Sequence, residues 1–535
     1  MKLSDLFKVS LLASAVTLAA CGGDIDITPT VNDNSTTTDN STNNSNNSTT
    51  DGGSTDDFEC ASYESDAGTV KGVFDGKDCT YNDSFASKSI EITSNITFEE
   101  IPDGGVHLFA EALLIGKDGD TTTGFTVPEN GPTLTVEPGA TLAFQSGEAI
   151  IRIARGAKIQ ANGTEAKPIT FTSANAFDRF DSTGNGARYA DWGGIIINGN
   201  GITDQCTDAE RAASTCNVPS EGITSYFGGN DNADSSGSIK WAKIWYAGSG
   251  PKVGGPGDDL NSLTLNAVGS GSAFDYLHIH QGFDDGIEFF GGAATIKHIV
   301  VTDTQDDSFD FDAGWQGKGQ FLFVQHGTVT LADGTIANMG NNGFESDGVK
   351  GESSAEVGPT NPTLANITVI TTDAKSVRDD DPSQAYKFDD EFNASIYNSL
   401  LVKKNAVETA CIEISSDGEK QADKIMFNNS VMACSSNFAE TDTFAAGPLA
   451  GQTKASWFEN SASSEILTDD VAVFAENGFA TNTASTDVTI SANDLTSLED
   501  SFFDTVDYIG AVSDTDTSSS WYKWVETALA AAAQD

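Results

Sequence analysis

Three short segments of the chain place carboxylates at matching positions, and carboxylate oxygens are ligands that calcium prefers in proteins. Residues 284–290 read DDGIEFF, residues 306–312 read DDSFDFD and residues 341–347 read NNGFESD. The first two segments begin 22 residues apart, and the third begins 35 residues after the second. We take nine acids of these segments as candidate calcium ligands: Asp284, Asp285, Glu288, Asp306, Asp307, Asp310, Asp312, Glu345 and Asp347.

The spacing of these segments indicates the fold that positions them. A period in the low twenties, short runs of β-branched and aromatic residues, and Gly, Asn or Asp between the runs predict an all-β fold, a right-handed parallel β-helix. Such a solenoid stacks its coils about 4.8 Å apart, and no coil buries its apolar face alone. A β-propeller would need repeats of about 40 residues or more, and a β-sandwich would show no such repeat.

Alignment of the three segments separates their side chains into two columns. The apolar column consists of Ile287, Phe309 and Phe344 and is expected to point inward. The acidic column consists of Glu288, Asp310 and Glu345 and is expected to point outward. Two carboxylates at the coil spacing repel by about 1 kcal/mol in water and about 3 kcal/mol at an effective dielectric constant of about 20. A divalent cation would turn this repulsion into stabilisation. The alternative is that Asp and Asn suit tight corners, where their side chains bond the backbone.

A catalytic use of the acids is the main functional alternative. Parallel β-helices often degrade acidic polysaccharides, with calcium holding the substrate acid and Arg or Lys acting as base. None of the six arginines repeats within the acidic segments, and a formal net charge of -51 would repel most acidic glycans. His278 and His280 lie at strand spacing, either as a metal or acid–base pair or as a packed pair. We expect a protein that is not an enzyme, with a polysaccharide lyase or hydrolase as the alternative.

The N-terminus has the pattern of an exported lipoprotein. Lys2 and Lys8 accompany a short apolar run over residues 11–20, which is too short to span a bilayer permanently. Small residues stand directly before Cys21, which predicts a cleaved signal peptide and a Cys21 that carries diacylglycerol and palmitate. Gly22 rather than Asp follows, so we expect the outer membrane and the cell surface. A body that faces the periplasm is the alternative.

Residues 24–57 are a low-complexity tract of Thr, Asn, Ser and Asp, which predicts a disordered tether. About 34 residues of flexible chain have a root-mean-square reach of roughly 30 Å. We divide the chain into a signal peptide (1–20), a lipidated tether (21–57), an N-terminal cap with the first strands (58–130), the β-helix (131–500) and a C-terminal cap (501–535).

The other six cysteines form three couples that are local in sequence: Cys60 with Cys79, Cys206 with Cys216, and Cys411 with Cys434. Six cysteines allow fifteen pairings, and nearest-neighbour pairing is our prediction. Disulfides suit the periplasm or the cell surface. Metal ligation is the alternative, but the sequence has no CxxC motif and no cysteine–histidine cluster.

The charge of the chain excludes one class of partner. Its 535 residues include 28 Lys and Arg against 79 Asp and Glu. Nucleic-acid binding requires a basic surface, so we expect no nucleic-acid partner. Anionic membrane surfaces would also repel such a chain, and the lipid on Cys21 would have to hold it there.

Several stretches resemble a family of secreted β-helical lipoproteins of marine bacteria. They are TLTVEPG (133–139), RGAKI (155–159), KPITFTS (167–173), DWGGIII (191–197), the run 283–292 and the segment 502–511. Within this family the chain is most similar to surface-layer (S-layer) proteins of marine gammaproteobacteria. The resemblance implies a secreted subunit of a two-dimensional lattice on the outer membrane, with further copies of the chain as its partners.

Two other roles stay open beside the lattice. One is a monomeric surface lipoprotein, because a lattice protein need not be lipidated. The other is an adhesin or glycan-binding protein, for which Trp192, Trp241 and Trp245 are the first candidates if they are exposed. Packing at coil corners is the alternative role for these three residues.

Overall fold

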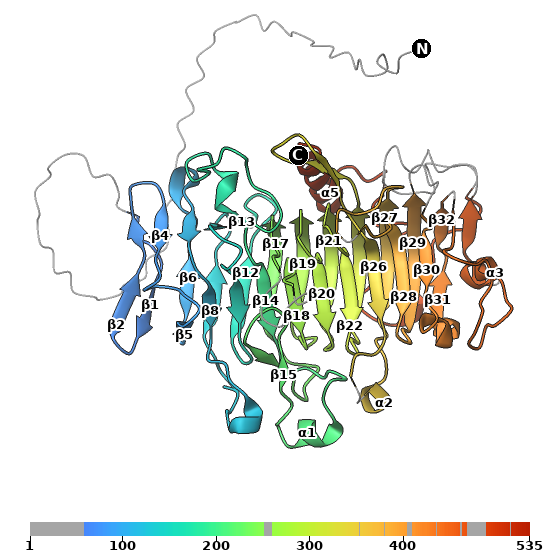
Figure 1. The fold of residues 1–535 in the computed structure, drawn as a ribbon, viewed down its shortest axis with the longest axis horizontal. Coiled ribbons are helices and arrows are strands. Elements are labelled where there is room, and N and C mark those ends of the chain that lie inside the picture. The colour runs from blue at the N-terminus through green and yellow to red at the C-terminus, as the bar shows by residue number, and fades with distance from the viewer. Residues whose placement is uncertain are drawn as a thin grey trace, which may run out of the picture. The chain divides into compact units, whose positions relative to one another are not determined.

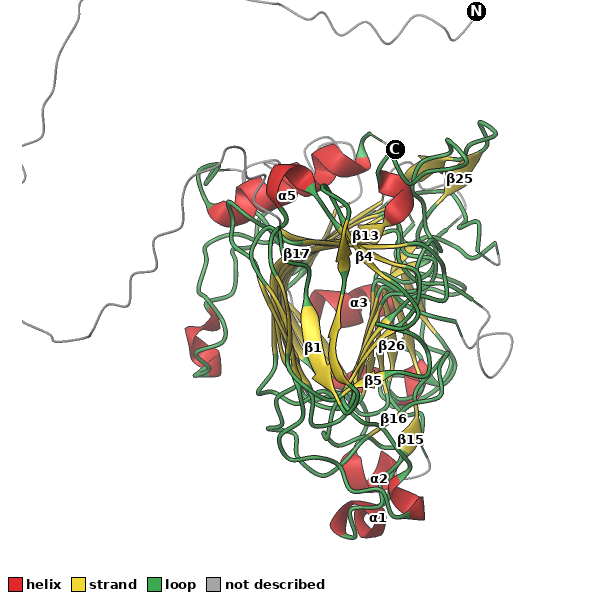
Figure 2. Ribbon diagram, turned by 90° about the vertical axis from the view of Figure 1, so that its left-hand side faces the viewer, coloured by secondary structure: helices red, strands yellow, loops and turns green. Residues whose placement is uncertain are grey.

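The repeated strands stack in parallel, which confirms the predicted all-β parallel β-helix (Figure 1). The computed structural model describes residues 58–250, 259–351, 354–378, 380–403, 409–434, 436–460, 463–467, 488–513 and 515–534. The predicted signal peptide, Cys21 and the tether lie outside these residues. In a view along the stack the strands superimpose into flat sides around a common interior (Figure 2), which buried apolar side chains fill.

One side of the solenoid is a ten-stranded parallel sheet. In stacking order its strands are β5 (Glu91–Ile92), β8 (Leu113–Ile115), β11 (Ile151–Ile153), β14 (Ile195–Asn198), β18 (Leu263–Asn266), β20 (Ile287–Phe290), β22 (Phe309–Asp312), β26 (Asn342–Asp347), β28 (Gln384–Asp389) and β30 (Ile412–Ile414). Ile287 lies opposite Phe309, which lies opposite Phe344, and all three are fully buried. The predicted inward column is therefore confirmed.

The other two sides are built largely by strands that continue from one side to the next. Six such strands are long: β17 (Gly237–Trp245), β19 (Ala273–His280), β21 (Thr295–Thr302), β23 (Lys318–Gln325), β27 (Thr363–Thr371) and β29 (Ala394–Lys403). Towards both ends of the stack, separate strands form these sides: β4 (Cys79–Tyr81), β6 (Ile96–Phe98), β7 (His107–Phe109), β9 (Thr133–Val136), β10 (Thr141–Phe144), β12 (Lys158–Asn162), β13 (Ile169–Ser173), β31 (Ile425–Asn428), β32 (Val431–Ala433) and β33 (Glu465–Leu467).

Each long strand bends at one residue with a positive φ. These residues are Trp241, Tyr276, His298, Phe321, Asn366 and Asn398, with φ between 49° and 59°. A left-handed backbone costs a residue with a side chain roughly 1–2 kcal/mol. Ring stacking offsets part of this cost, because Trp241 stacks on Tyr276 with ring centroids 3.7 Å apart and Tyr276 stacks on His298 at 4.3 Å.

The C-terminal segment lies along this line of bends. Asn366 donates its side-chain amide to the Tyr508 carbonyl over 3.2 Å. The helix α5 (Ser520–Ala532) then packs beside β19 and β21, where Trp524 meets the ring of Trp241 edge-on at 5.4 Å. The segment thus shields the side of the stack at the bends.

The remaining elements are short and lie at the ends and corners of the stack. They are the strands β1 (Ser62–Ser65), β2 (Gly68–Lys71), β3 (Val73–Phe74), β15 (Val218–Pro219), β16 (Tyr226–Phe227), β24 (Thr328–Thr330) and β25 (Ile336–Asn338), and the helices α1 (Asp208–Ala212), α2 (Ser354–Val357) and α3 (Lys454–Glu459). No helix among the described residues has the length and apolar character required to cross a membrane.

The six cysteines of the folded part join in the three predicted pairs. The Cα–Cα distances are 5.6 Å for Cys60–Cys79, 5.5 Å for Cys206–Cys216 and 6.3 Å for Cys411–Cys434. These distances are ordinary for disulfides. The predicted nearest-neighbour pairing is therefore confirmed.

Candidate metal site

The acidic column of the sequence alignment is present on the outer face of the ten-stranded sheet. Glu288 lies opposite Asp310 in the neighbouring strand, and Asp310 lies opposite Glu345. The next residue of the column is Lys387, which ends the run of acids. Strand pairing thus holds three carboxylates at coil spacing, as predicted from the repeats.

The corner acids Asp285 and Asp307 have a backbone role. An oxygen of Asp285 accepts the amide N–H of Asp307 at 3.0 Å, and an oxygen of Asp307 accepts the N–H of Asn342 at 2.6 Å. Asn261 starts this ladder by accepting the N–H of Asp285 at 3.1 Å. The alternative stated for corner acids, in which the side chain bonds the backbone, therefore holds for one oxygen of Asp285 and one oxygen of Asp307.

The other oxygen of Asp307 faces a second acid. Burial, followed by the nearby Glu345, raises the pKa of Asp307 well above its usual value. Burial opposes ionisation of Glu345 too, but its hydrogen bond with Asp307 and the neighbouring Lys387 keep the pKa of Glu345 below its usual value. The hydrogen bond between the two carboxyl groups and the ion pair of Glu345 with Lys387 thus provide partners for these two acids within the protein.

Arg378 neutralises a second group of acids. Its guanidinium contacts Asp259 and Asp284 at 2.8 Å each and Asp306 at 2.6 Å, and it donates to the Phe283 carbonyl at 3.1 Å. The sequence analysis missed this residue, because Arg378 stands in a corner segment far along the chain and outside the repeat. No arginine lies within the acidic segments, as the sequence shows, but Arg378 reaches them from outside the repeat.

Two lysines balance further carboxylates. Lys350 contacts Asp312 at 2.6 Å and lies 4.4 Å from the centre of the Phe290 ring. Lys387 forms an ion pair with Glu345. Neither lysine belongs to the acidic segments; Lys387 lies opposite Glu345 in the neighbouring strand, whereas Lys350 comes from a corner segment outside the strand register.

Three further carboxylates lie together without a direct ion pair among the described residues, although nearby Lys350 acts to lower the pKa of Glu288 and of Asp310. Oxygens of Asp285, Glu288 and Asp310 lie within 4.8 Å of one another. Two ligands of one calcium ion, each about 2.4 Å from it, are at most about 4.8 Å apart, so this group fits one calcium ion. We call these three residues the coil triad. Asp284, Asp285 and Asp306 meet the same distance criterion, but Arg378 already bridges Asp284 and Asp306.

The coil triad is buried and incompletely satisfied. Glu288 is 5% exposed and Asp285 is 7% exposed. The Oδ1 atom of Asp310 is buried and has no hydrogen-bond partner, whereas Asn261 donates to Glu288 at 2.5 Å. Burial, and then neighbouring carboxylates, raise the pKa of all three acids well above the usual range. A cation would relieve both the burial of charge and the mutual repulsion.

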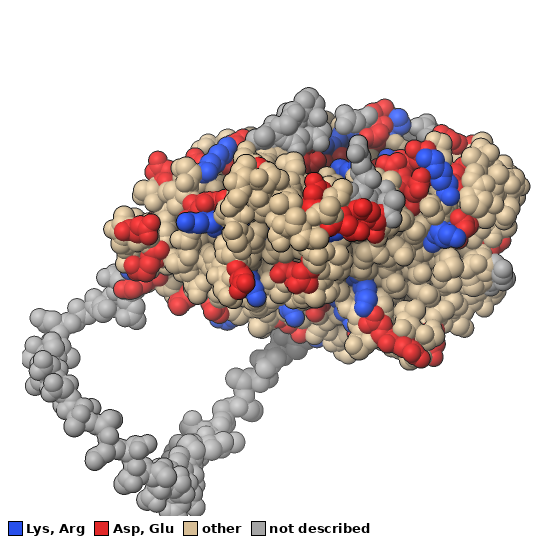
Figure 3. Space-filling view, turned by 90° about the horizontal axis from the view of Figure 1, so that it is seen from below, with Lys and Arg blue, Asp and Glu red and all other residues tan. Residues whose placement is uncertain are grey.

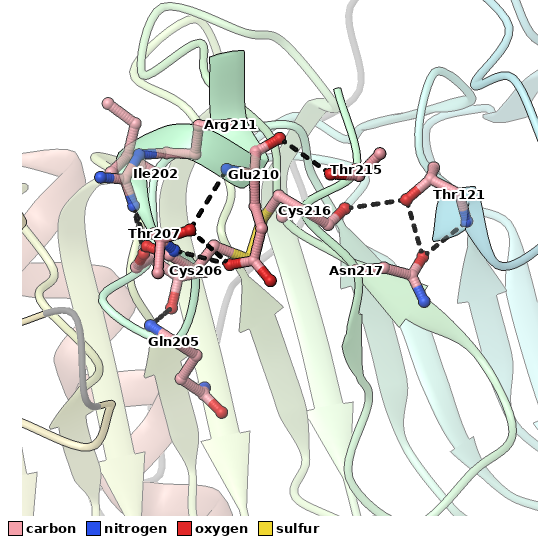
Figure 4. Close-up of a disulfide and its surroundings, with 12 residues drawn as sticks. Thr121, Ile202, Gln205, Cys206, Thr207, Glu210, Arg211, Thr215, Cys216 and Asn217 are labelled. Carbon is pink, nitrogen blue, oxygen red and sulfur yellow. Dashed lines mark hydrogen bonds between the residues drawn. A yellow bond between two sulfur atoms is a disulfide. The ribbon is translucent and has the colours of Figure 1, made fainter. Parts of the chain in front are cut away.

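An extension between β14 and β17 covers part of this face of the sheet. Its disulfide Cys206–Cys216 lies beside α1, whose N-terminus is closed by a capping box between Thr207 and Glu210 (Figure 4). The Cys216 carbonyl accepts from Thr121 at 3.1 Å, which fastens the extension to an earlier corner (Figure 4). Buried Arg155 donates to the same carbonyl at 3.1 Å.

Beyond the disulfide, the extension approaches the coil triad. A cavity of about 340 Å³ separates the extension from the sheet, and Glu221, Phe290 and Lys350 are among its lining residues. The charge of Glu221 contributes to the raised pKa of Glu288, after burial. The extension therefore adds a further acid next to the triad rather than a compensating cation.

The predicted histidine pair is packed. His278 and His280 are both 1% exposed, and each ring lies within hydrogen-bond distance of the Thr302 hydroxyl, at 3.0 and 2.8 Å. Burial lowers the pKa of His278 well below its usual value. Neither histidine belongs to a group of potential metal ligands among the described residues.

The candidate aromatic platform is not formed. Trp192 is fully buried and stacks on Phe144 at 4.4 Å, and Trp241 is stacked at the strand bend beneath α5. Trp245 is half-buried, with its ring N–H 3.1 Å from a ring nitrogen of His278. The structure therefore supports the alternative role for these residues, which is packing within the coils, and not an exposed aromatic surface.

Known proteins bear on the fold of this chain. A family model described as the pectate-lyase-like β-helix domain matches residues 111–470. No curated protein and no solved structure matches the chain.

Proposed function

The chain belongs to the family of pectate-lyase-like β-helix domains, and we propose that it is a structural cell-surface lipoprotein, the subunit of a calcium-dependent surface layer. This fold is compatible with a surface protein and with a polysaccharide-degrading enzyme. The choice between them therefore depends on the acidic face rather than on the fold.

The clustering of three buried carboxyl groups that form no direct ion pair among the described residues is the observation that carries the proposal. The acidic face holds nine acids of the repeated segments, and Arg378, Lys350 and Lys387 are the cations paired with them. The coil triad receives none of these ion pairs among the described residues. A calcium ion there would add two positive charges between two neighbouring coils.

Calcium at the coil triad would act as a structural clamp. Asp285 and Glu288 belong to one coil and Asp310 belongs to the next, so a shared ion would join the two coils. The ion would neutralise charge and provide no group that leaves or attacks. This reading suits a rigid building block whose faces must keep their shape.

The remaining parts of the proposal come from the N-terminus. Cys21 would carry the lipid that holds the chain to the outer membrane, and the polar tract before residue 58 would separate the body from the lipid. With lipid as anchor, lateral order between copies would be a property of the solenoid.

Two experiments test the surface layer. Protease treatment of intact cells should remove the solenoid while periplasmic proteins survive. Extracted protein with calcium should form ordered arrays visible by electron microscopy, and a chelator should disperse them. Absence of arrays with calcium present, or protection of the solenoid in intact cells, would reject the proposal.

A polysaccharide-degrading enzyme is the second candidate, and two observations favour it. The family is named for its likeness to pectate lyase, and Arg378 provides a basic group next to the coil triad. Three carboxylates and a carbonyl already occupy the Arg378 guanidinium, however, which disfavours a role as base. Release of unsaturated or reducing ends from alginate or pectate, lost in Arg378→Gln, would establish the enzyme instead.

A further inference from the structure

The negative charge of this chain should make its copies repel one another over most of their surface. In the proposed surface layer, on which this inference rests, copies must therefore meet at a contact that avoids the repulsion. The formal net charge is -51. On the face drawn in Figure 3, Asp and Glu form several groups and outnumber Lys and Arg. Charges repel strongly within the Debye length of about 8–10 Å. Direct contact between copies is therefore expected where the surface is apolar and its charges are paired.

One such surface is the hairpin formed by β24 and β25. Residues 327–340 contain a single charged side chain, Asp333. Ile336 is 64% exposed near its tip, while Val329 and Ala337 on the opposite face are buried against the body. Figure 2 shows β25 projecting away from the sheets at one corner. The hairpin therefore presents an apolar side chain on a firmly packed base.

A second exposed apolar residue lies against this hairpin. Val377 is 47% exposed, and its backbone N–H donates to the Asn338 carbonyl at 2.9 Å. The adjacent Arg378 fixes this segment through its ion pairs with Asp284 and Asp306. Described residues with large exposed apolar side chains are few, and two of them lie on this hairpin and on the segment bonded to it. We call the hairpin together with Val377 the knob.

The complementary surface is a groove on the early coils of the ten-stranded sheet. It has a volume of about 590 Å³ and five apolar lining residues, of which Leu114 and Ile223 are half-buried and Ala112, Ile150 and Leu260 are buried. Its charged lining residues form two ion pairs, Lys88 with Glu148, and Arg152 with Glu91 at 3.2 Å. The groove is thus electrically balanced, in contrast to the chain as a whole.

We propose that the knob of one copy docks into the groove of a second copy, with Ile336 against Leu114 and Ile150. The contact buries apolar surface and places only Asp333 near balanced charges. Among the described residues no aromatic side chain lines the groove, which disfavours a sugar ring as occupant. Because knob and groove are different surfaces of the same chain, the contact repeats from copy to copy and generates rows.

Two single substitutions and their mixture test the contact, with the full lipidated chain on phosphatidylcholine vesicles in calcium. Ile336→Asp places a carboxylate on the knob, and Leu114→Asp places a carboxylate in the groove. Each should reduce the area of ordered array at least about tenfold, because an unpaired carboxylate would be buried. Met426→Asp, at a residue 44% exposed on β31, is the matched control and should leave the arrays intact.

The mixture gives the sharpest result. Ile336→Asp keeps its groove and Leu114→Asp keeps its knob, so an equal mixture should form dimers and no rows. Undiminished arrays of Ile336→Asp would overturn the proposed contact while the surface layer stands. The melting temperature of each variant establishes that it is folded.

A photo-cross-linking amino acid at position 336 provides an independent readout. Mass spectrometry should find adducts on peptides that contain Leu114 or Ile150. If the wild type forms no arrays in calcium, the proposed surface layer fails, and the cross-link alone decides the contact. Absence of adducts in the groove would then overturn it.

Discussion

Substitution of Asp310 by Asn should convert a calcium-stabilised solenoid into a calcium-independent one. Asp310 lies between Glu288 and Glu345 in the acidic column, and it belongs to the coil triad. The amide keeps the shape of the side chain and removes its charge. Without calcium the variant should therefore be more stable than the wild type, and with calcium it should gain little.

The coil spacing sets the size of this effect. One carboxylate pair about 4.8 Å apart repels by about 3 kcal/mol at an effective dielectric constant of about 20. The raised pKa of Asp310 means that part of this repulsion is already relieved by protonation, so about 3 kcal/mol is an upper limit. Calcium at about one hundred times its dissociation constant would stabilise the wild type by about 2.7 kcal/mol.

Thermal unfolding followed by circular dichroism provides the assay. Residues 56–535 form one compact unit, for which an entropy of about 2.1 cal/mol/K per residue converts about 3 kcal/mol into about 3 °C. The wild type should melt about 3 °C higher in calcium than in chelator. Asp310→Asn should melt up to about 3 °C above the wild type in chelator and respond little to calcium.

A neutral substitution outside the site controls for charge alone. Asp66→Asn, in the exposed turn between β1 and β2, should leave the calcium response unchanged. A full calcium response in Asp310→Asn, or a lower melting temperature of this variant in chelator, would refute the assignment of the coil triad.

Three further predictions follow from other buried groups. Arg378→Gln leaves Asp259, Asp284 and Asp306 without their cation and should destabilise the calcium-free protein by about 3–5 kcal/mol; isothermal titration should then show an additional calcium equivalent, and an unchanged stoichiometry would contradict the view that the arginine takes the place of an ion. Burial lowers the pKa of Lys403 to about 7. The unfolded chain therefore binds more protons than the folded one above that pH, so stability should rise by about 1.4 kcal/mol per pH unit from pH 7 towards pH 10; denaturant titration of Lys403→Met should lack this rise, and an identical slope in both proteins would exclude the buried lysine as its source. The Cys206–Cys216 disulfide closes a loop with a sequence separation of 10, and its double replacement by Ser should cost about 3 kcal/mol, measured by urea unfolding with the wild type under non-reducing conditions as reference; no loss would show that the extension is held by its hydrogen bonds alone.

The sequence by itself determined the repeated part of the molecule. In a parallel stack the residue above Ile287 must again be apolar, and it is Phe309, because both point into one continuous core. The same pairing places Asp310 beside Glu288, so the acidic column could be predicted from the repeat. Asn261 also carried a signal, since it stands two residues before Leu263 as Asp285 stands two before Ile287.

Only the tertiary structure decided which acids have partners. Arg378 and Lys350 reach the acidic face from corner segments, and a repeat fixes only the residues in its own register, as it does for Lys387 opposite Glu345. Corner segments differ in length from coil to coil, so the sequence of a corner does not indicate which residues its side chains contact. For the same reason the burial of Trp192 could not be predicted, since it follows from the coils stacked against it. Periodic contacts recur along the chain and leave a pattern in the sequence, whereas contacts between distant corners occur once and leave none.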